Sequence, residues 1–351
     1  MRYLTAIPIL VLCLISCEPN DPGPVIVTDA KTAFEGNGIF IMNEGNFTRG
    51  NGSLSFYSSD SAKIYNNIFY AANKRTPGDI PFSMYVSGDT ACLIVNNSGK
   101  IEVVSRKTML SLKTVTGIKS PRYMVKTGGD KYYISSLYSD SLTLFSLSSC
   151  SITGFIDIGK SSEQMLVAGS KAYIASWSGG RVVTVVDIAS DEIVKTIEVG
   201  LEPESMVSDR DGNIWVLCSG GYMGEEDPVL IRIDPSTDLI TRSISYSRSD
   251  YPTNLRINAG GDSLYYLKNG VYRMSVYDNS LPVEPLIMEQ GRLFYRMEPD
   301  NLNNSIFVTD ANDYQRSGFL LRYSNNGALL ESNVAGIIPG NMSIQSIKSG
   351  R

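Results

Sequence analysis

The sequence predicts an all-β protein: a seven-bladed β-propeller of four-stranded antiparallel blades, closed by pairing of the C-terminal strand with the N-terminal blade. A tetrad ending in methionine recurs at Met84, Met124, Met165 and Met206, with spacings of 40, 41 and 41 residues. Each repeat contains short β-branched and aromatic runs bounded by Gly, Asp, Asn and Ser, and no long segment shows a convincing helical period. Four strands in about 40 residues is the size of a propeller blade.

The N-terminus has the layout of a secretory signal peptide, for which we expect residues 1–16. A basic start at Arg2 precedes an apolar stretch that ends at Ile15, too short for a permanent membrane span. The ending Leu-Ile-Ser-Cys17 resembles the bacterial lipobox, in which the signal is cleaved before a cysteine that then carries lipid. We therefore expect lipidation of Cys17; the alternative is an ordinary signal peptide with an incidental cysteine. Residues 17–36, which include an acidic, Pro-rich run after Cys17, are expected to form a flexible tether.

The propeller itself is predicted over residues 37–351. For the first blade the expected second, third and fourth strands are Gly38–Met42, Ser53–Tyr57 and Lys63–Phe69. Six complete units follow, and they begin near Pro81, Pro121, Ser162, Pro203, Pro252 and Arg292. Pro339–Met342 repeats the opening tetrad, but too little chain remains to finish a blade. We expect this last strand to lie beside the strand that holds Met42, because closure removes two exposed sheet edges. Six or eight blades are the alternatives.

Composition excludes several classes of function. The net charge of −5 opposes binding to nucleic acid, which is held through clustered Lys and Arg. The chain has no His, so it lacks Ser-His-Asp and Cys-His nucleophile systems and imidazole ligands for zinc, copper or haem. The mature domain keeps Cys92, Cys150 and Cys218, an odd number that argues against a disulfide framework. We expect these to be small buried thiols.

Candidate ligand-binding residues lie in loops that a propeller brings to one end of the ring. These are the loops between second and third strands and the loops that enter the next blade. The residues are Asn43, Glu44, Asn96, Asn97, Arg122, Tyr138, Gln164, Trp177, Tyr222, Asn254, Asp310, Asn312 and Tyr314. Aromatic rings offer rigid contact area and amides both donate and accept, so this end suits a large ligand with apolar and polar groups. Turn chemistry alone explains part of the Asn, Gly and Asp content.

No catalytic or metal-binding residue is assigned from the sequence. Asp310, Asn312 and Asp313 carry oxygen ligands but lack the spacing and terminal Glu of a calcium loop. The acidic run Glu225–Asp227 is interpreted as a solvated loop. The repeated methionines are interpreted as core residues at the start of inner strands, not as copper ligands.

Several segments together resemble a known family. They are Ile41–Phe47 with Gly52–Tyr57, Val95–Ile101, Ser120–Tyr123, Glu163–Met165, and Trp215–Leu217 with Gly220–Tyr222. They are similar to the YncE-like propeller lipoproteins of Bacteroidetes, and within these to the BtuG-type cobalamin-capturing surface lipoproteins. The resemblance implies a lipid-anchored protein on the outer face of the outer membrane, which captures cobalamin or a related corrinoid and passes it to a BtuB-type TonB-dependent transporter.

Two other classes of function stay open. A propeller with a different cargo, such as a glycan or a protein partner, would share the same anchor and fold. An enzyme, for example a lyase or lactonase using carboxylates, Tyr or a divalent ion, would need convergent acids near the channel mouth, whereas the acids here are scattered. The expectation is therefore a non-enzymatic binding protein that requires no cofactor, with cobalamin as its bound ligand.

Overall fold

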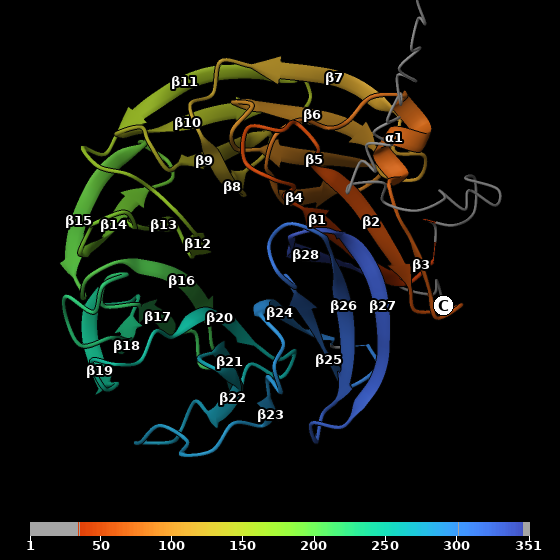
Figure 1. Cartoon of the computed structure of the whole chain (residues 1–351). Helices are drawn as coiled ribbons and strands as arrows, with labels where there is room; N and C mark the ends of the chain where they lie inside the picture. The colour runs from red at the N-terminus through yellow and green to blue at the C-terminus, as the bar shows by residue number, and fades with distance from the viewer. Residues whose placement is uncertain (1–33, 35, 301, 347–351) are drawn as a thin grey trace, which may run out of the picture.

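Seven four-stranded antiparallel sheets form a ring in the computed structural model, which describes residues 34, 36–300 and 302–346 (Figure 1). In six sheets the strands follow chain order from the centre outward, and in the remaining sheet the last strand joins the first three. The predicted seven-bladed β-propeller is therefore confirmed. The inner strands β4, β8, β12, β16, β20, β24 and β28 surround the central channel (Figure 1).

The strand bounds agree closely with the predicted repeats. Blade 1 contains β28 (Pro339–Gln345), β1 (Gly38–Asn43), β2 (Ser53–Ser58) and β3 (Lys63–Tyr65). Blades 2 and 3 contain β4 (Pro81–Ser87), β5 (Thr90–Val95), β6 (Lys100–Ser105), β7 (Ser111–Thr116), β8 (Pro121–Gly128), β9 (Lys131–Ser136), β10 (Ser141–Ser146) and β11 (Ser151–Asp157). Blades 4 and 5 contain β12 (Met165–Ala168), β13 (Lys171–Ala175), β14 (Val182–Asp187), β15 (Glu192–Glu198), β16 (Pro203–Ser208), β17 (Ile214–Cys218), β18 (Val229–Asp234) and β19 (Leu239–Ser245). Blades 6 and 7 contain β20 (Thr253–Ile257), β21 (Ser263–Leu267), β22 (Gly270–Ser275), β23 (Ile287–Met288), β24 (Phe294–Asp300), β25 (Ser305–Asp310), β26 (Ser317–Ser324) and β27 (Leu329–Ile337).

The core lies between the faces of neighbouring blades. One cluster joins Tyr173 and Val185 of blade 4 to Met206 and Val216 of blade 5. Second strands are buried on both faces, as in β17, where all five residues are buried, because a blade packs against each side of them. Met124, Met165 and Met206 are buried in such clusters, which confirms the core role predicted for the repeated methionines.

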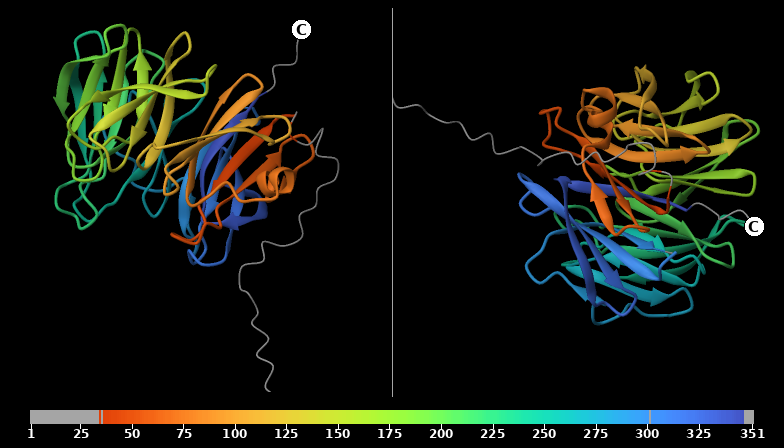
Figure 2. Two further views of the ribbon diagram at one scale, coloured as in Figure 1. Left: turned by 90° about the horizontal axis from the view of Figure 1, so that it is seen from above. Right: turned by 90° about the vertical axis from the view of Figure 1, so that its right-hand side faces the viewer.

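The last strand closes the ring. β28 pairs antiparallel with β1, and Met342 lies opposite Ile41, next to Met42, as predicted. Both side views in Figure 2 accordingly show the blue C-terminal segment beside the red-orange N-terminal one. Outside the ladder, the N–H groups of Glu44 and Gly45 donate to the carbonyls of Ile338 and Ile337, at 2.9 and 3.0 Å. Closure therefore leaves β1 with a hydrogen-bonded neighbour on each side.

One predicted strand is shorter than expected. The segment Lys63–Phe69 was expected to be a single strand, but β3 ends at Tyr65 and a short helix α1 (Ile68–Asn73) follows. Asn67 has a positive φ of 55°, which turns the chain out of the strand direction before the helix. The helix buries Ile68 and Phe69 in the core of blades 1 and 2, so their apolar character reflects packing of a helix instead of a strand.

The predicted signal peptide, Cys17 and nearly all of the tether lie outside the described residues. Within the residues that are described, no helix is long and apolar enough to cross a bilayer.

Candidate functional site

A circuit of side-chain hydrogen bonds joins the blades around the channel. From blade 1 to blade 4, Nδ2 of Asn341 donates to the Phe82 carbonyl (3.0 Å), Oγ of Ser83 donates to the Arg122 carbonyl (2.5 Å), and the Arg122 guanidinium donates to Glu163 (2.7 Å). From blade 4 to blade 7, Gln164 accepts from the Met206 N–H (2.7 Å), Ser205 accepts from the Leu255 N–H (2.9 Å), and Asn254 accepts from the Met297 N–H (2.6 Å). The Tyr295 hydroxyl of blade 7 donates to Glu44 of blade 1 (3.1 Å) and completes the circuit. Every junction between neighbouring blades has at least one such bond. Polar residues of the inner strands are thus used largely to hold the ring together.

Arg122 is bound on three sides. Its guanidinium makes two hydrogen bonds to the Glu163 carboxylate, both 2.7 Å long, and the two side chains are only 9% and 5% exposed. It lies 3.4 Å from the Phe82 ring centroid and 5.6 Å from that of Trp177. The Arg122 guanidinium therefore lies close to the Trp177 ring, and Glu163 neutralises its charge.

Arg296 differs from the other arginines of the channel. Arg256 pairs with Glu298 at 2.8 Å, but Arg296 has no carboxylate within ion-pair distance in the described part of the chain. Its Nη1 donates to the Tyr295 carbonyl at 3.2 Å, and its Nε is buried without a partner. The guanidinium lies 4.7 Å from the Tyr295 ring centroid. The described part of the chain thus offers no acceptor to its remaining N–H groups.

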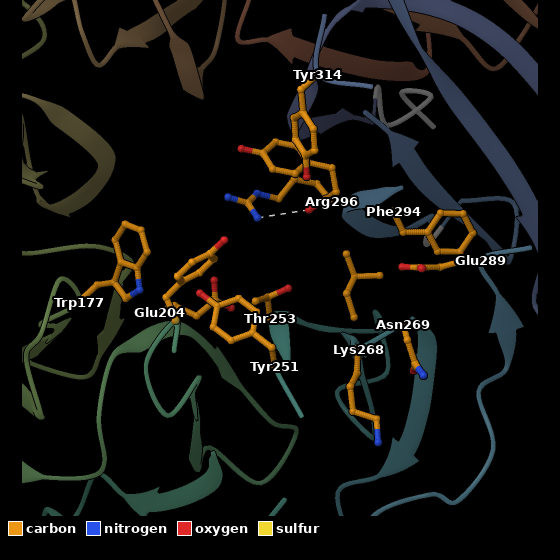
Figure 3. A pocket seen from close by; sticks show the side chains of 13 residues that line it. Trp177, Glu204, Tyr251, Thr253, Lys268, Asn269, Glu289, Phe294, Arg296 and Tyr314 are labelled. Carbon is orange, nitrogen blue, oxygen red and sulfur yellow. Dashed lines mark hydrogen bonds between the residues drawn. The ribbon is translucent and has the colours of Figure 1, made fainter. Parts of the chain in front are cut away.

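Arg296 lines a cavity of about 400 Å³ at the mouth of the channel, which we call the aromatic cavity. Its aromatic lining consists of Trp177, Tyr222, Tyr251, Phe294, Tyr295 and Tyr314. Its polar lining consists of Glu204, Thr253, Lys268, Asn269, Glu289 and Arg296, and Leu267 completes the wall. Figure 3 shows Trp177 on one side and Phe294 with Glu289 on the other, with the Arg296 guanidinium extending into the space between.

The lining comes from the two loop classes that the sequence predicts to converge. Trp177, Tyr222, Asn269 and Tyr314 follow the second strands of blades 4 to 7, as β13, β17, β21 and β25 end. Tyr251 and the start of β24 belong to the segments that enter blades 6 and 7. Convergence at one end of the ring follows from strand order and antiparallel pairing, so four blades contribute to one cavity.

Burial sets the protonation of the channel groups. It raises the pKa of Glu44, an effect opposed by the charges of Arg296 and Arg122 and by the hydrogen bond from Tyr295. Burial and the nearby Glu44 raise the pKa of Tyr295, so that hydroxyl stays protonated and donates. Burial lowers the pKa of Arg296, but Tyr295, Tyr123 and Glu204 outweigh it and hold the pKa above its ordinary value. Arg296 is therefore a permanent cation.

The structure divides the predicted binding residues into three groups. Trp177, Tyr222 and Tyr314 line the aromatic cavity. A second group is wholly or partly buried with hydrogen bonds inside the protein: Asn43, Glu44, Asn96, Arg122, Gln164, Asn254 and Asp310. The third group lies outside the cavity lining: Asn97, which bonds Asp79, Asn312, which donates to the Ser317 carbonyl, and Tyr138, which is 61% exposed. Most of the predicted amides thus serve the ring itself.

The candidate residues from the sequence do not include ten residues of the lining: Glu204, Tyr251, Thr253, Leu267, Lys268, Asn269, Glu289, Phe294, Tyr295 and Arg296. A register shift in the pairing of β24 with β25 lies between Phe294 and Arg296, and similar shifts occur at the start of β4, β8, β16 and β20. Such bulges re-aim side chains, so the simple alternation of inward and outward residues fails at this point. The usable signal was the recurrence of polar and aromatic residues just before each methionine of the repeat.

Three acidic residues near the cavity, Asp310, Glu226 and Asp227, pair with arginines of the protein. Oδ1 of Asp310 accepts from the N–H groups of Leu293 and Asn312, and Oδ2 pairs with Arg292 at 3.2 Å. In the loop between β17 and β18, Glu226 pairs with Arg181 and Asp227 with Arg248. No group of three or more acidic or thiol side chains suited to a metal ion occurs among the residues that the structure describes.

Comparisons with known proteins agree with this fold. A quinonprotein alcohol dehydrogenase-like protein from Bacteroides thetaiotaomicron is 13% identical with a TM-score of 0.69, over 88% of this chain and 79% of that one. A functionally unknown protein from Desulfotomaculum acetoxidans is 14% identical with a TM-score of 0.67, over 88% and 98%. A protein from Lactobacillus plantarum is 13% identical with a TM-score of 0.65, over 88% and 100%.

No curated protein matches the chain. The model of the family described as Domain of unknown function (DUF5074) matches residues 37–310, which is most of the chain. The chain therefore belongs to the DUF5074 family, and its fold is a seven-bladed propeller that resembles the YncE-like propellers.

Proposed function

We propose that this protein captures a corrinoid, with cobalamin as the preferred candidate, at the aromatic cavity. The observation that carries the proposal is the convergence of six aromatic side chains and an unpaired arginine on one cavity at the channel mouth. Aromatic faces pack against a flat macrocycle with little loss of conformational entropy. Because the chain has no His, no protein imidazole ligates cobalt, and binding uses ring packing and hydrogen bonds to the corrin amides.

The size of the cavity determines how such a ligand would sit. A volume of about 400 Å³ lies within the range of small-molecule sites, but a whole corrinoid is larger. One edge of the macrocycle would therefore enter the cavity, and the rest would cover the channel mouth. Tyr222 is 79% exposed at the rim, where it packs edge-on against Tyr251 with ring centroids 6.0 Å apart. In the proposed complex, both rings would cover the outer part of the ligand.

The alternative cargo is a glycan. Trp177 provides a face for a sugar ring, and Glu204, Asn269 and Lys268 provide acceptors and donors within the same cavity. These groups are the ordinary means of sugar recognition, so the same experiment must include both ligand classes.

Two tryptophans make a site-specific test practical. Trp177 lines the cavity, whereas the indole of buried Trp215 donates to Asp209 at 2.9 Å inside blade 5. We expect titration with cyanocobalamin to give saturable heat in calorimetry and to shift the indole N–H resonance of Trp177 but not that of Trp215. Replacing Trp177 or Tyr251 by Ala should weaken binding, and Y138A is the matched control because Tyr138 is exposed outside the cavity. A saturable Trp177 shift with oligosaccharides and none with cyanocobalamin would replace the corrinoid by a glycan.

The cellular setting forms part of the proposal. Lipidation of Cys17 would anchor the propeller at the outer face of the outer membrane, where a TonB-dependent transporter of the BtuB type would receive the corrinoid. The C17S variant should lose membrane association and lower corrinoid uptake while keeping affinity in solution. Equal uptake by cells with the wild-type chain and cells with no copy of it would contradict the transport role.

A further inference from the structure

We infer that Arg296 and Glu204 together bind a neutral carboxamide group of the ligand. This inference rests on the proposed function only for which ligand carries the carboxamide. Glu204 lies on β16 of blade 5, and Arg296 lies on β24 of blade 7, with blade 6 between them in the ring. Both residues line the aromatic cavity. Among the described residues, Arg296 has hydrogen-bond donors without an acceptor, and Glu204 has an acceptor oxygen without a donor.

Arg296 supplies the donors. The other arginines of the inner strands have carboxylate partners, Glu163 for Arg122 and Glu298 for Arg256. Arg296 uses one N–H on the Tyr295 carbonyl and has none of its charge neutralised at ion-pair distance within the described residues. Its buried Nε has no acceptor in this part of the chain, and a buried donor left unsatisfied costs free energy, which favours a ligand group that accepts hydrogen bonds from the guanidinium.

Glu204 supplies the acceptor. Its Oε1 already accepts from Oγ of Ser205 at 2.6 Å and from the N–H of Asn254. Its other oxygen makes no hydrogen bond within the part of the chain that the structure describes. Glu204 also acts on Arg296 electrostatically, since it raises the pKa of that guanidinium, although the two are too far apart to form an ion pair. Both side chains line the same cavity, so one ligand group there could contact both.

The charges around the cavity select the kind of bridge. A carboxylate would face Glu204, Glu289 and the buried Glu44, whereas an ammonium group would face Arg296. Lys268 does not change this balance, because it pairs with Asp250 at 3.2 Å. A carboxamide adds no charge, accepts from Arg296 through its carbonyl and donates to Glu204 through its NH₂ group. The rim of a corrin macrocycle bears such primary amides.

The test compares amides with the matching acids. Cyanocobalamin and its monocarboxylates, in which one rim amide is hydrolysed, are titrated into wild type, R296Q and E204Q. Charge-assisted hydrogen bonds make a ten- to hundredfold loss of affinity for cyanocobalamin the expected result for R296Q. E204Q keeps a carbonyl for the Asn254 N–H, and it should bind the amide and at least one monocarboxylate with nearly equal affinity, unlike wild type. The R181M variant, which alters an exposed ion pair on the neighbouring loop, is the matched control.

A small probe separates this inference from the corrinoid proposal. Nicotinamide should shift the Trp177 indole resonance of wild type and not of R296Q, and nicotinate should shift it less than nicotinamide. If nicotinamide behaves so and cyanocobalamin does not bind, the corrinoid proposal fails and the carboxamide site stands. If cyanocobalamin binds but both variants keep the wild-type preference for amide over acid, the carboxamide site is refuted. Thermal unfolding of R296Q at or above the wild-type temperature would show that lost affinity is not lost folding.

Discussion

Replacing Arg122 by Met tests whether the predicted binding residues of the inner strands serve the ring. The substitution keeps an apolar side chain over Phe82 but removes both hydrogen bonds to Glu163. The Glu163 carboxylate, 5% exposed, would then be buried without its partner. The blade 3 to blade 4 junction would also lose its bond in the circuit around the channel.

The magnitude follows from the burial of the pair. Breaking a buried ion pair by removing one partner costs about 3 to 5 kcal/mol of unfolding free energy, because a charge is left uncompensated. At roughly 2 °C per kcal/mol for a domain of this size, the melting temperature should fall by about 6 to 10 °C. The matched change at the exposed pair, R181M, should cost less than about 1 kcal/mol, since Arg181 and Glu226 are 47% and 37% exposed.

Urea unfolding followed by circular dichroism, at several pH values, measures both effects. Burial already raises the pKa of Glu163, and Arg122 opposes the rise, so removing Arg122 raises that pKa further. The difference in unfolding free energy between R122M and wild type should therefore become smaller as the pH falls and Glu163 becomes protonated. The double variant R122M/E163L should recover most of the loss, because two apolar side chains replace the charges. Equal stability of R122M and R181M at pH 7 would refute this account of the ring.

Three further predictions concern the fold. Truncation after residue 337 removes β28 and exposes an edge of β1, so the protein should aggregate or lose cooperative unfolding, as measured by light scattering and urea titration. Burial raises the pKa of Glu44, Glu163 and Glu298, so their contribution to the free energy of unfolding is greatest below the usual carboxyl pKa of 4.5 and is lost as pH rises through their folded-state pKa values. E44Q should therefore reduce the dependence of the urea midpoint on pH. Burial raises the pKa of Cys92 to about 12 and also raises the pKa of Cys218, so a disulfide reagent should label partly exposed Cys150 first, and rapid labelling of all three in native buffer would contradict the burial.

Much of the architecture was readable from residue patterns because a propeller repeats one local pattern. The methionine tetrads, the short β-branched runs and the split terminal blade predicted the number of blades and the β28–β1 pairing, both of which the structure confirms. The error at Lys63–Phe69 has a local cause, since Ile68 and Phe69 are apolar for packing and the positive φ of Asn67 redirects the chain. Periodicity over seven residues does not distinguish a strand from a strand followed by one helical turn.

The candidate site was only partly readable. Position in the chain identified Trp177, Tyr222 and Tyr314, because the loops that carry them meet at one end of any propeller. Position could not tell that Asn254 and Arg122 bind neighbouring blades, nor that Tyr138 lies outside the cavity. Those outcomes depend on which partner lies across a blade junction.

The sequence by itself therefore determined the closed seven-bladed ring, the absence of imidazole chemistry and the end of the ring where aromatic loops gather. Only the tertiary structure decided which polar groups are hydrogen-bonded within the protein and which face the cavity. Arg122 and Arg296 occupy similar positions at the start of inner strands, yet one meets Glu163 and the other meets no carboxylate at ion-pair distance among the described residues. The physical reason is that pairing energy depends on separations of a few ångströms between blades, which no single-chain pattern encodes.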